Sequence, residues 1–299
     1  MKILISTSSI RQNIINELIK NNFIVKLNPY KRTLTTKEFI ELTKDVDGII
    51  AGTENITKEA LRLRPNIKVI SRCGTGLDNL DTVACNELGI KFYNTPDACT
   101  VAVAEFTVAL TLNLIKNILI MDSNLKAGNW SKLPGNMIES KNIGIIGFGK
   151  IGHQVAKLLS NFNVEIAYND LKTQNCKYKY MNKHDLILWS DIVLLHVSNI
   201  NSNCVIDKKE LENFKKTAYL INTSRGICIN EEALYQSLKR GDLAGAALDV
   251  FAEEPYCGKL RELNNVILTP HCASNTIESR EKMEIEALNN LLKGFDYLL

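Results

Sequence analysis

The stretch Asn142-Ile143-Gly144-Ile145-Ile146-Gly147-Phe148-Gly149-Lys150-Ile151-Gly152 indicates how this chain folds. Its first five residues form a mostly apolar run typical of a buried β-strand, and three closely spaced glycines follow. Apolar residues then return at helical spacing. The order is therefore strand, glycine turn and helix, which is a building unit of parallel α/β sheets.

The same alternation of short apolar runs and helical patterns continues along most of the chain. Most of the runs lack polar alternation, so helices should cover both faces of each sheet. A length of 299 residues favours two domains. Residues 100–126 predict one long, mostly buried helix, packed either inside one domain or against a second domain or subunit. The expected strands are 2–6, 48–51, 69–72, 91–93, 142–146, 164–168, 192–195, 219–222, 246–248 and 266–268.

Composition limits the class of protein. With 36 basic and 33 acidic residues the net charge is only +3, which argues against a nucleic-acid or membrane partner. No apolar run is long enough for a membrane span. The eight cysteines are irregularly spaced and include no C-x-x-C pair, so we expect no metal site and a cytoplasmic protein with reduced thiols.

The glycine turn has the spacing of a dinucleotide-binding motif. Gly147 permits the tight turn, Gly149 lets the backbone approach a pyrophosphate, and Gly152 lets the helix pack on the strand. Asp170 ends the next expected strand, where a carboxylate can bind ribose hydroxyls and repel a 2′-phosphate. The sequence therefore favours NAD over NADP, although Lys172 could weaken that discrimination.

Three further chemically capable side chains lie in segments that follow expected strands. Arg225 offers a planar cation for a carboxylate or a developing alkoxide. His271 can exchange a proton near neutral pH. Glu254, preferred here over Glu253, can orient the imidazole and favour its charged form. Because the carboxyl ends of parallel strands meet at one edge, these groups are candidates for a single site.

With these segments, and with 71–79, 94–96 and 103–105, the chain resembles the D-isomer-specific 2-hydroxyacid dehydrogenases over nearly its whole length. The resemblance implies NAD-dependent hydride transfer between a 2-hydroxy acid and a 2-keto acid. In it, Arg225 holds the substrate carboxylate and C2 oxygen, His271 exchanges the hydroxyl proton, and Glu254 binds His271. It also implies that Arg72, Gly74, Thr75 and Gly76 bind the substrate. The cofactor contacts it implies are Gly147, Gly149, Lys150, Ile151, Gly152, Asp170, His196, Thr223, Ser224 and Asp249, with a structural role for His196 equally open.

The resemblance also predicts the domain organisation. We expect an α/β protein with two Rossmann-like doubly wound domains, of which the substrate-binding domain is discontinuous. Its first part is residues 1–97 and its return segment is 273–299, on either side of an NAD-binding Rossmann domain at 98–272. The long apolar helix and the resemblance together suggest a homodimer.

The substrate is the most open question. Segments 72–79 and 94–96 most resemble the D-3-phosphoglycerate dehydrogenases, and the C-terminal regulatory domain of longer members is not expected after His271. However, residues 50–54 contain no arginine for a phosphate. The favoured substrate pair is 3-phosphoglycerate and 3-phosphohydroxypyruvate, and glyoxylate, hydroxypyruvate or a phosphonate-bearing keto acid are alternatives. A non-catalytic NAD(H)-sensing protein of the same fold is a further alternative, and the presence of Arg225, Glu254 and His271 argues against it.

Two cysteines flank expected site residues. Cys73 follows Arg72 and Cys272 follows His271, so oxidation of either could inhibit the protein. The preferred interpretation is that both are small buried apolar side chains.

Overall fold

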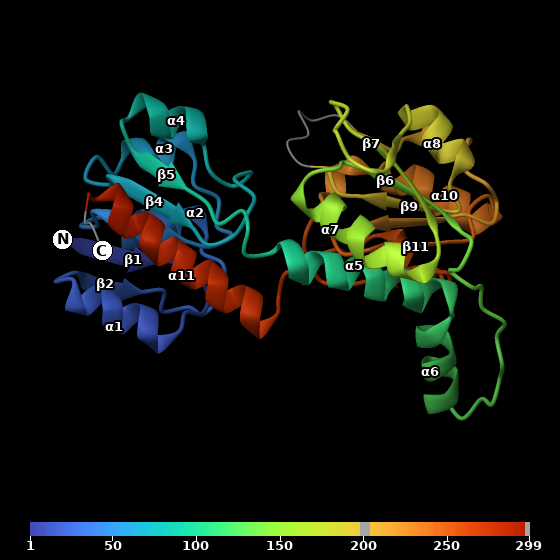
Figure 1. Cartoon of the computed structure of the whole chain (residues 1–299). Coiled ribbons are helices and arrows are strands. Elements are labelled where there is room, and N and C mark those ends of the chain that lie inside the picture. The colour runs from blue at the N-terminus through green and yellow to red at the C-terminus, as the bar shows by residue number, and fades with distance from the viewer. Residues whose placement is uncertain (198–203, 297–299) are drawn as a thin grey trace. The chain divides into compact units, whose positions relative to one another are not determined.

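A computed structural model describes residues 1–197 and 204–296, so the last three residues of the expected return segment 273–299 lie outside the description. The chain divides into two compact units (Figure 1). The first unit comprises Met1–Cys99 and Asn275–Leu299, and the second comprises Thr100–Ser274. The first unit is therefore built from two stretches of chain that are far apart in the sequence.

The first unit contains a five-stranded sheet in which every pairing is parallel. Its strand order is β2-β1-β3-β4-β5. This is one of the two common doubly wound orders. The strands are β1 (Lys2–Ile5), β2 (Ile24–Leu27), β3 (Gly48–Ala51), β4 (Val69–Arg72) and β5 (Lys91–Tyr93).

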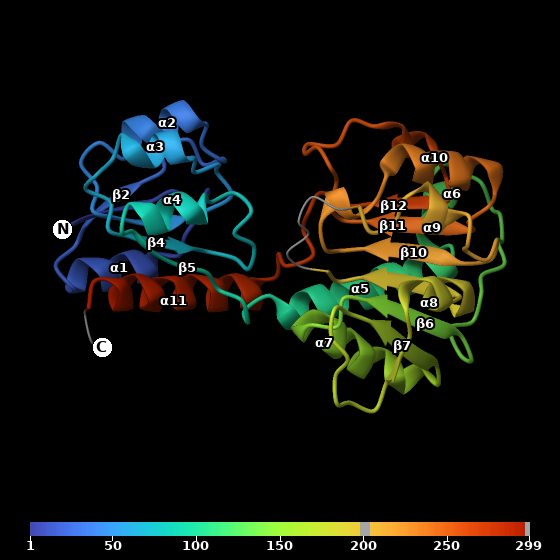
Figure 2. The same ribbon diagram turned by 90° about the horizontal axis from the view of Figure 1, so that it is seen from above.

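Helices cover both faces of this sheet (Figure 2). One face carries α2 (Thr36–Leu42), α3 (Lys58–Arg62) and α4 (Thr82–Glu87), whose apolar side chains share one core with the strands. The other face carries α1 (Gln12–Lys20) and α11 (Ile277–Gly294). The returning chain is thus an integral layer of the first unit.

The second unit contains a seven-stranded parallel sheet of order β12-β11-β10-β9-β6-β7-β8. The chain winds outward from β6 in one direction and from β9 in the other. The boundary between β6 and β9 is therefore the topological switch point, where open α/β sheets bind ligands. The strands are β6 (Asn142–Ile146), β7 (Glu165–Asn169), β8 (Lys179–Tyr180), β9 (Ile192–Leu195), β10 (Tyr219–Asn222), β11 (Gly245–Leu248) and β12 (Val266–Leu268).

Successive strand residues in this sheet serve two separate cores. Ile143 and Ile145 pack in the core shared with α5 (Thr100–Ile115) and α7 (Lys150–Leu159). Ile146 packs in the core on the opposite face. That face carries α8 (Lys183–Trp189), α9 (Lys208–Leu211) and α10 (Glu231–Arg240). Short 3₁₀ turns lie at Ser160–Phe162, Gly226–Cys228 and Lys259–Glu262. The predicted doubly wound α/β fold, with helices on both sheet faces, is confirmed.

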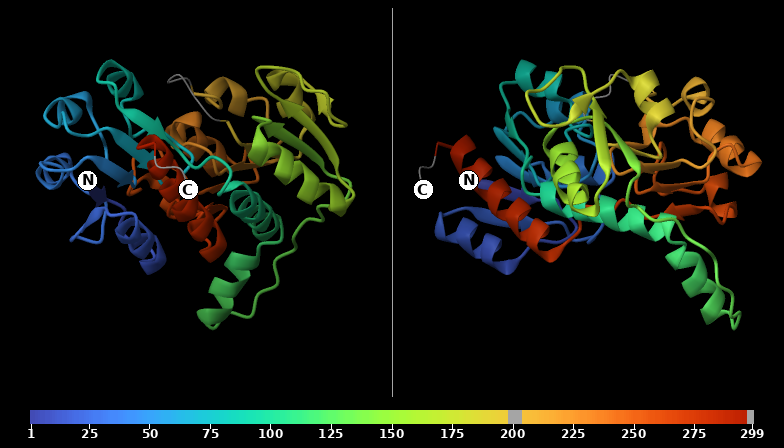
Figure 3. Two further views of the ribbon diagram at one scale, coloured as in Figure 1. Left: turned by 60° about the vertical axis from the view of Figure 1, so that its left-hand side comes forward. Right: turned by 45° about the vertical axis from the view of Figure 1, so that its right-hand side comes forward.

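The predicted single helix over 100–126 is wrong, because the chain bends by 64° between α5 and α6 (Ile118–Lys126). Asn117 adopts a left-handed backbone conformation at φ 56°. The loop that follows α6 also occupies a carbonyl at the end of α5, since the N–H of Asn136 donates to the carbonyl of Ile115 at 2.7 Å. The prediction of burial holds for α5, whereas α6 has no buried residue and projects from the second unit (Figure 3).

Two strands were not predicted, and both lie at sheet edges. β2 contains no buried residue, and both residues of β8 are exposed. β8 lies within the basic stretch Lys177–Lys183. Within residues 1–197 and 204–296, no single helix is long and apolar enough to cross a membrane, although the bent α5–α6 pair passes that test by length and composition.

Candidate active site

The glycine turn after β6 requires its glycines for steric reasons. Gly147 has φ +91°, and a Cβ there would lie 2.5 Å from the carbonyl carbon of His196. A Cβ on Gly152 would lie 2.4 Å from the carbonyl oxygen of Gly147. A Cβ on Gly149 would meet nothing within 4 Å, so this side of the turn is open. Gly149 caps α7 without a side-chain hydrogen bond, and the start of a helix is a place where backbone N–H groups can bind an anion.

Asp170 follows β7 and is fixed against this turn. Its Oδ2 accepts the Phe148 N–H at 2.6 Å, and its Oδ1 accepts the Leu171 N–H at 2.6 Å. Gln174 Nε2 donates to the carbonyl of Phe148 at 2.7 Å and holds the turn from the same segment. The turn, the helix start and the carboxylate together fit a dinucleotide, because each carboxylate oxygen still has a lone pair for a ribose hydroxyl.

His196 follows β9 and is almost completely enclosed. Burial lowers the pKa of His196 to about 3, so the ring is neutral near pH 7. Its Nδ1 lies 3.5 Å from the Thr223 hydroxyl at the end of β10. Thr223 also contacts the hydroxyl of Thr107 on α5 at 2.9 Å. Sequence reasoning missed Thr107, although a threonine inside a nearly charge-free apolar helix is a detectable signal.

Arg225 lies in the loop after β10, and neighbouring groups hold its backbone. Asn222 Nδ2 donates to the carbonyl of Arg225 at 2.9 Å, and the Ser224 hydroxyl donates to Asn222 Oδ1 at 2.8 Å. A Cβ on Gly226 would lie 1.8 Å from the carbonyl carbon of Phe251. Gly226 therefore lets the Arg225 loop lie directly against the loop after β11.

The loop after β11 supplies the carboxylate that meets the histidine. Glu254 Oε2 lies 2.8 Å from His271 Nδ1, and Glu254 Oε1 accepts the Phe251 N–H at 3.0 Å. Both side chains remain partly exposed. Because Nδ1 faces the carboxylate, Nε2 is the ring nitrogen that can exchange a proton with a ligand.

Asp249 is fully buried at the end of β11 and organises the loop that carries His271. Its Oδ1 accepts the Thr269 hydroxyl at 2.6 Å and the Cys272 N–H at 2.9 Å, and its Oδ2 accepts the Ala273 N–H at 2.9 Å. His271, between these donors, has a left-handed backbone at φ 50°. A side chain rarely adopts that conformation unless its surroundings hold it there.

The two flanking cysteines have weakly acidic thiols. Burial raises the pKa of Cys73 to about 11. Burial, together with the negative charge of Asp249, also raises the pKa of Cys272. Both thiols are therefore protonated at neutral pH, which favours the interpretation that they are unreactive apolar side chains.

The expected substrate-binding residues lie in the first unit, in the loop after β4. Gly74 has φ +142°, and a Cβ there would lie 1.3 Å from Arg72 Nη1, so only glycine leaves room for the guanidinium. The Gly74 N–H donates to Thr95 Oγ1 at 2.8 Å. The Gly74 N–H is therefore already bonded within the protein. Within the described part of the chain, the N–H groups of Thr75 and Gly76 have no such acceptor.

A buried carboxylate that sequence reasoning missed follows β3 in the same unit. Glu54 is 1% exposed and accepts the Gly52 N–H at 3.1 Å and the hydroxyl of Ser6. A buried polar residue just beyond an apolar strand was its only sequence signal. The segment 50–54 thus carries an acidic residue and no arginine.

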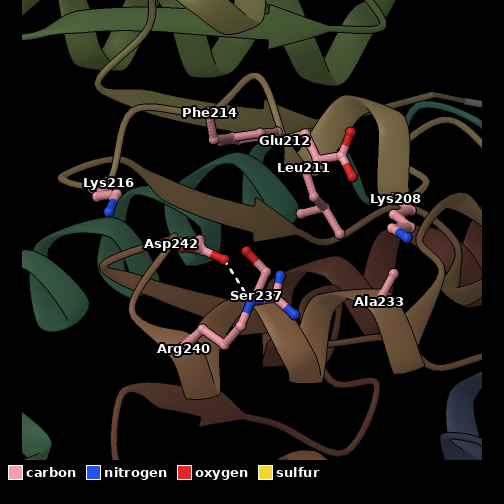
Figure 4. A pocket seen from close by; sticks show the side chains of 9 residues that line it. All are labelled: Lys208, Leu211, Glu212, Phe214, Lys216, Ala233, Ser237, Arg240 and Asp242. Carbon is pink, nitrogen blue, oxygen red and sulfur yellow. Dashed lines mark hydrogen bonds and ion pairs between the residues drawn. The ribbon is translucent and has the colours of Figure 1, made fainter.

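A separate hollow of about 260 Å³ lies along α9 and α10, and none of the expected site residues lines it (Figure 4). Arg240 and Asp242 form an ion pair at its rim, with Nε and Oδ2 2.8 Å apart. Within residues 1–197 and 204–296, no group of three or more His, Cys, Asp or Glu side chains is arranged to hold a metal ion.

Comparison with known proteins identifies the family. The model of the D-isomer specific 2-hydroxyacid dehydrogenase NAD-binding domain matches residues 108–273. A glyoxylate reductase of Thermofilum pendens is 39% identical over 272 residues, which cover 86% of this chain and 80% of that protein. A D-3-phosphoglycerate dehydrogenase of Methanocaldococcus jannaschii is 35% identical over 276 residues, covering 87% of this chain and 52% of the relative.

A solved structure agrees with these matches. The NADPH-dependent glyoxylate/hydroxypyruvate reductase of Sinorhizobium meliloti superposes with a TM-score of 0.88 at 26% identity, over 98% of this chain and 94% of that one. The family match covers the glycine turn and the strand ends that carry Arg225, Glu254 and His271. The chain therefore belongs to the D-isomer-specific 2-hydroxyacid dehydrogenases, NAD-dependent oxidoreductases that act on the CH–OH group of their substrates.

Proposed function

We propose that this protein reduces a small 2-keto acid to the 2-hydroxy acid, with glyoxylate or hydroxypyruvate preferred over 3-phosphohydroxypyruvate. The observation that carries the reaction is the 2.8 Å contact between Glu254 Oε2 and His271 Nδ1, at the sheet edge that also bears the glycine turn. A carboxylate at that distance orients the imidazole ring and leaves Nε2 as the nitrogen that faces away from it. The histidine can then act as a general acid.

The roles follow from the charge that the reaction creates. Bound NADH supplies the hydride to C2 of the keto acid. His271 Nε2 donates a proton to the C2 oxygen, and Glu254 keeps the ring oriented. The Arg225 guanidinium stabilises the negative charge that develops on the same oxygen and holds the carboxylate. Arg72 and the N–H groups of Thr75 and Gly76 supply further anion contacts.

The expected cofactor residues fall into two classes, those that would contact the cofactor directly and those whose polar groups are already bonded within the protein. Gly147, Gly149 and Gly152, with Lys150 and Ile151 at the start of α7, would hold the pyrophosphate. Asp170 would bind the adenosine ribose, and its charge supports NAD over NADP. The Ser224 hydroxyl and the Asp249 carboxylate are already bonded within the protein, so these residues act by shaping the surface that the cofactor meets. His196 and Thr223 act in the same way.

The substrate preference rests on the segment after β3. Some phosphoglycerate enzymes are expected to supply an arginine for the phosphate in this segment, and residues 50–54 of this chain contain none. The names of the glyoxylate reductase relatives support the same preference. 3-Phosphohydroxypyruvate is the second candidate, supported by Arg72 and the segment 72–79.

A substrate panel tests this preference. Purified protein with NADH would be given glyoxylate, hydroxypyruvate and 3-phosphohydroxypyruvate, and NADH absorbance would be followed. We expect the largest kcat/KM with one of the first two. A larger kcat/KM with the phosphorylated acid would reverse the preference. No turnover of any keto acid, with NADH still bound, would favour the non-catalytic sensor.

His271→Asn tests the acid–base role. The change removes the proton donor, so we expect kcat to fall by about 10²–10⁴-fold. His184→Asn is the matched control, because His184 is exposed on α8. Near-normal turnover in His271→Asn would remove this residue from the reaction.

The organisation of the molecule is part of the same proposal. We assign substrate recognition to the first unit and cofactor binding to the second, which contains the family match. All eight cysteines are free, which supports a reducing, cytoplasmic setting. The unburied helix α6 supports a homodimer.

A further inference from the structure

A chain of buried polar groups links α5 to the ends of β10 and β9 in the second unit. Thr107 is fully buried, and Thr223 and His196 are each 8% exposed. Thr107 Oγ1 lies 2.8 Å from the carbonyl of Val103 and 2.9 Å from Thr223 Oγ1. Thr223 Oγ1 lies 3.5 Å from His196 Nδ1, the longest of the three contacts.

The protons available to these groups decide which group donates and which accepts in each of the three contacts. Each threonine hydroxyl has one proton, and the Val103 carbonyl can only accept. If Thr107 donates to Val103, then Thr223 must donate to Thr107. The Thr223 oxygen is then left as an acceptor, and His196 Nδ1 must carry the ring proton. All three contacts are satisfied only in this arrangement.

The other ring nitrogen supports the same assignment. Among the described residues, His196 Nε2 is buried and has no hydrogen-bond partner. A proton on Nε2 would be a buried donor without an acceptor, which proteins avoid more strictly than an unpaired acceptor. Burial lowers the pKa of His196 to about 3, so a single ring proton must be placed near pH 7.

This series of hydrogen bonds also fixes the position of the segment that carries Arg225. Thr223 lies two residues before Arg225. The Asn222 side chain donates to the Arg225 carbonyl and accepts the N–H and the hydroxyl of Ser224. The Thr223 hydroxyl is the side-chain link from this segment to α5. A change at Thr107 would therefore be transmitted to the Arg225 loop without any contact between Thr107 and a ligand.

We propose that Thr107 is a positioning residue that, through Thr223, fixes His196 as the Nδ1-protonated tautomer and holds the Asn222–Arg225 segment in place. The tautomer assignment stands on the apoprotein alone, whereas the consequence for Arg225 rests on the proposed function. Thr107 thus lies outside the reacting groups and acts only through Thr223.

Nitrogen-15 NMR of the histidine-labelled apoprotein tests the tautomer directly. The four histidine signals can be assigned with His153→Asn, His184→Asn and His271→Asn, which leave His196 in place. We expect the His196 proton on Nδ1, with no titration between about pH 5 and 8, the range in which an ordinary histidine changes charge. A wild-type signal with the proton on Nε2 would overturn the proposal.

Three threonine variants test the positioning role. In Thr107→Val the hydroxyl of Thr223 is free to donate to His196 Nδ1, and only the buried Nε2 still favours the Nδ1-protonated form, so we expect the population of that form to fall. We also expect KM for the keto acid to rise on the order of tenfold, because Arg225 is less well placed. Thr107→Ser should restore both values, and NADH affinity should change far less than KM.

Thr111→Val is the matched control. Thr111 is fully buried one turn later in α5, and its hydroxyl donates only to the carbonyl of Thr107 at 2.8 Å. We expect neither the tautomer nor KM to change in it. Equal effects in Thr111→Val and Thr107→Val would overturn the proposal in favour of helix packing.

The two proposals fail in distinguishable ways. Absence of turnover in the wild-type protein would contradict the proposed function, while the NMR assignment would still decide the tautomer. If Thr107→Val does not fold, Thr107→Ser and the wild-type tautomer remain decisive. An unchanged His196 signal in a folded Thr107→Val would show that Thr107 does not set the tautomer.

Discussion

At the scale of single residues, Gly147 and Gly149 have different reasons to be glycine. Gly147 has a positive φ, and its Cα lies against the backbone of His196, so the fold itself excludes a side chain there. Gly149 has an ordinary negative φ and open space where a Cβ would point. A requirement for glycine at 149 would therefore come from the bound cofactor.

Paired alanine variants separate these two reasons. Gly147→Ala should lower the free energy of unfolding by about 1–3 kcal/mol or more, because it forces a strained backbone and a steric overlap. Gly149→Ala should change it by less than about 0.5 kcal/mol but weaken NADH binding roughly tenfold, or about 1.4 kcal/mol. Denaturation and NADH fluorescence titration measure the two effects. A Gly149→Ala protein as unstable as Gly147→Ala would contradict this division.

At the scale of elements, the loops after β11 and β12 act together through Asp249. Its carboxylate accepts from one side chain and two backbone N–H groups of the loop that carries His271. The reacting histidine of the proposed mechanism therefore depends on a neighbouring strand for its left-handed backbone. Asp249 is a positioning residue rather than a catalytic one.

Asp249→Asn should cost both stability and turnover. An amide presents one acceptor oxygen and places donors opposite backbone N–H groups, so we expect about 1–3 kcal/mol of destabilisation and a lower kcat. Asp191→Asn is the control, since Asp191 also accepts a backbone N–H, that of Asn142 at 2.9 Å, but precedes β9 at the opposite sheet edge. If kcat fell by the same factor in Asp249→Asn and Asp191→Asn for the same loss of stability, the result would argue against a positioning role for Asp249.

At the scale of the whole molecule, α6 is the element that the monomer does not explain. It has no buried residue, and the chain that follows it includes Trp130, which is 82% exposed. Leu125 and Met137 in the same region are also exposed. These exposed apolar side chains, together with the unburied helix α6, are the basis of the homodimer proposal.

Light scattering tests this assembly. We expect a dimer for the wild-type protein and a monomer for the double variant Leu125→Glu/Trp130→Glu, because burying two carboxylates at an apolar interface is strongly unfavourable. Leu63→Glu, which places a charge at an exposed leucine of the first unit, should remain dimeric. A monomeric wild-type protein at working concentration would refute the proposal.

The sequence by itself determined the strands that are buried on both faces, such as Ile192–Leu195 and Gly48–Ala51, since only a continuous apolar run can fill two cores. It also determined the glycine turn and the residue types at the strand ends. It did not reveal β2 and β8, which are edge strands without a buried residue and in which Lys26 and Lys179 interrupt the apolar pattern.

Only the tertiary structure decided the break between α5 and α6 and the hydrogen-bond partners of the site. The break depends on Asn136, which is distant in sequence from the carbonyl it binds. The occupied N–H of Gly74, the carboxylate of Asp249 and the chain from Thr107 to His196 likewise join separate elements. Local patterns report which side chains a strand or helix carries, whereas hydrogen bonds between elements exist only once the layers have packed.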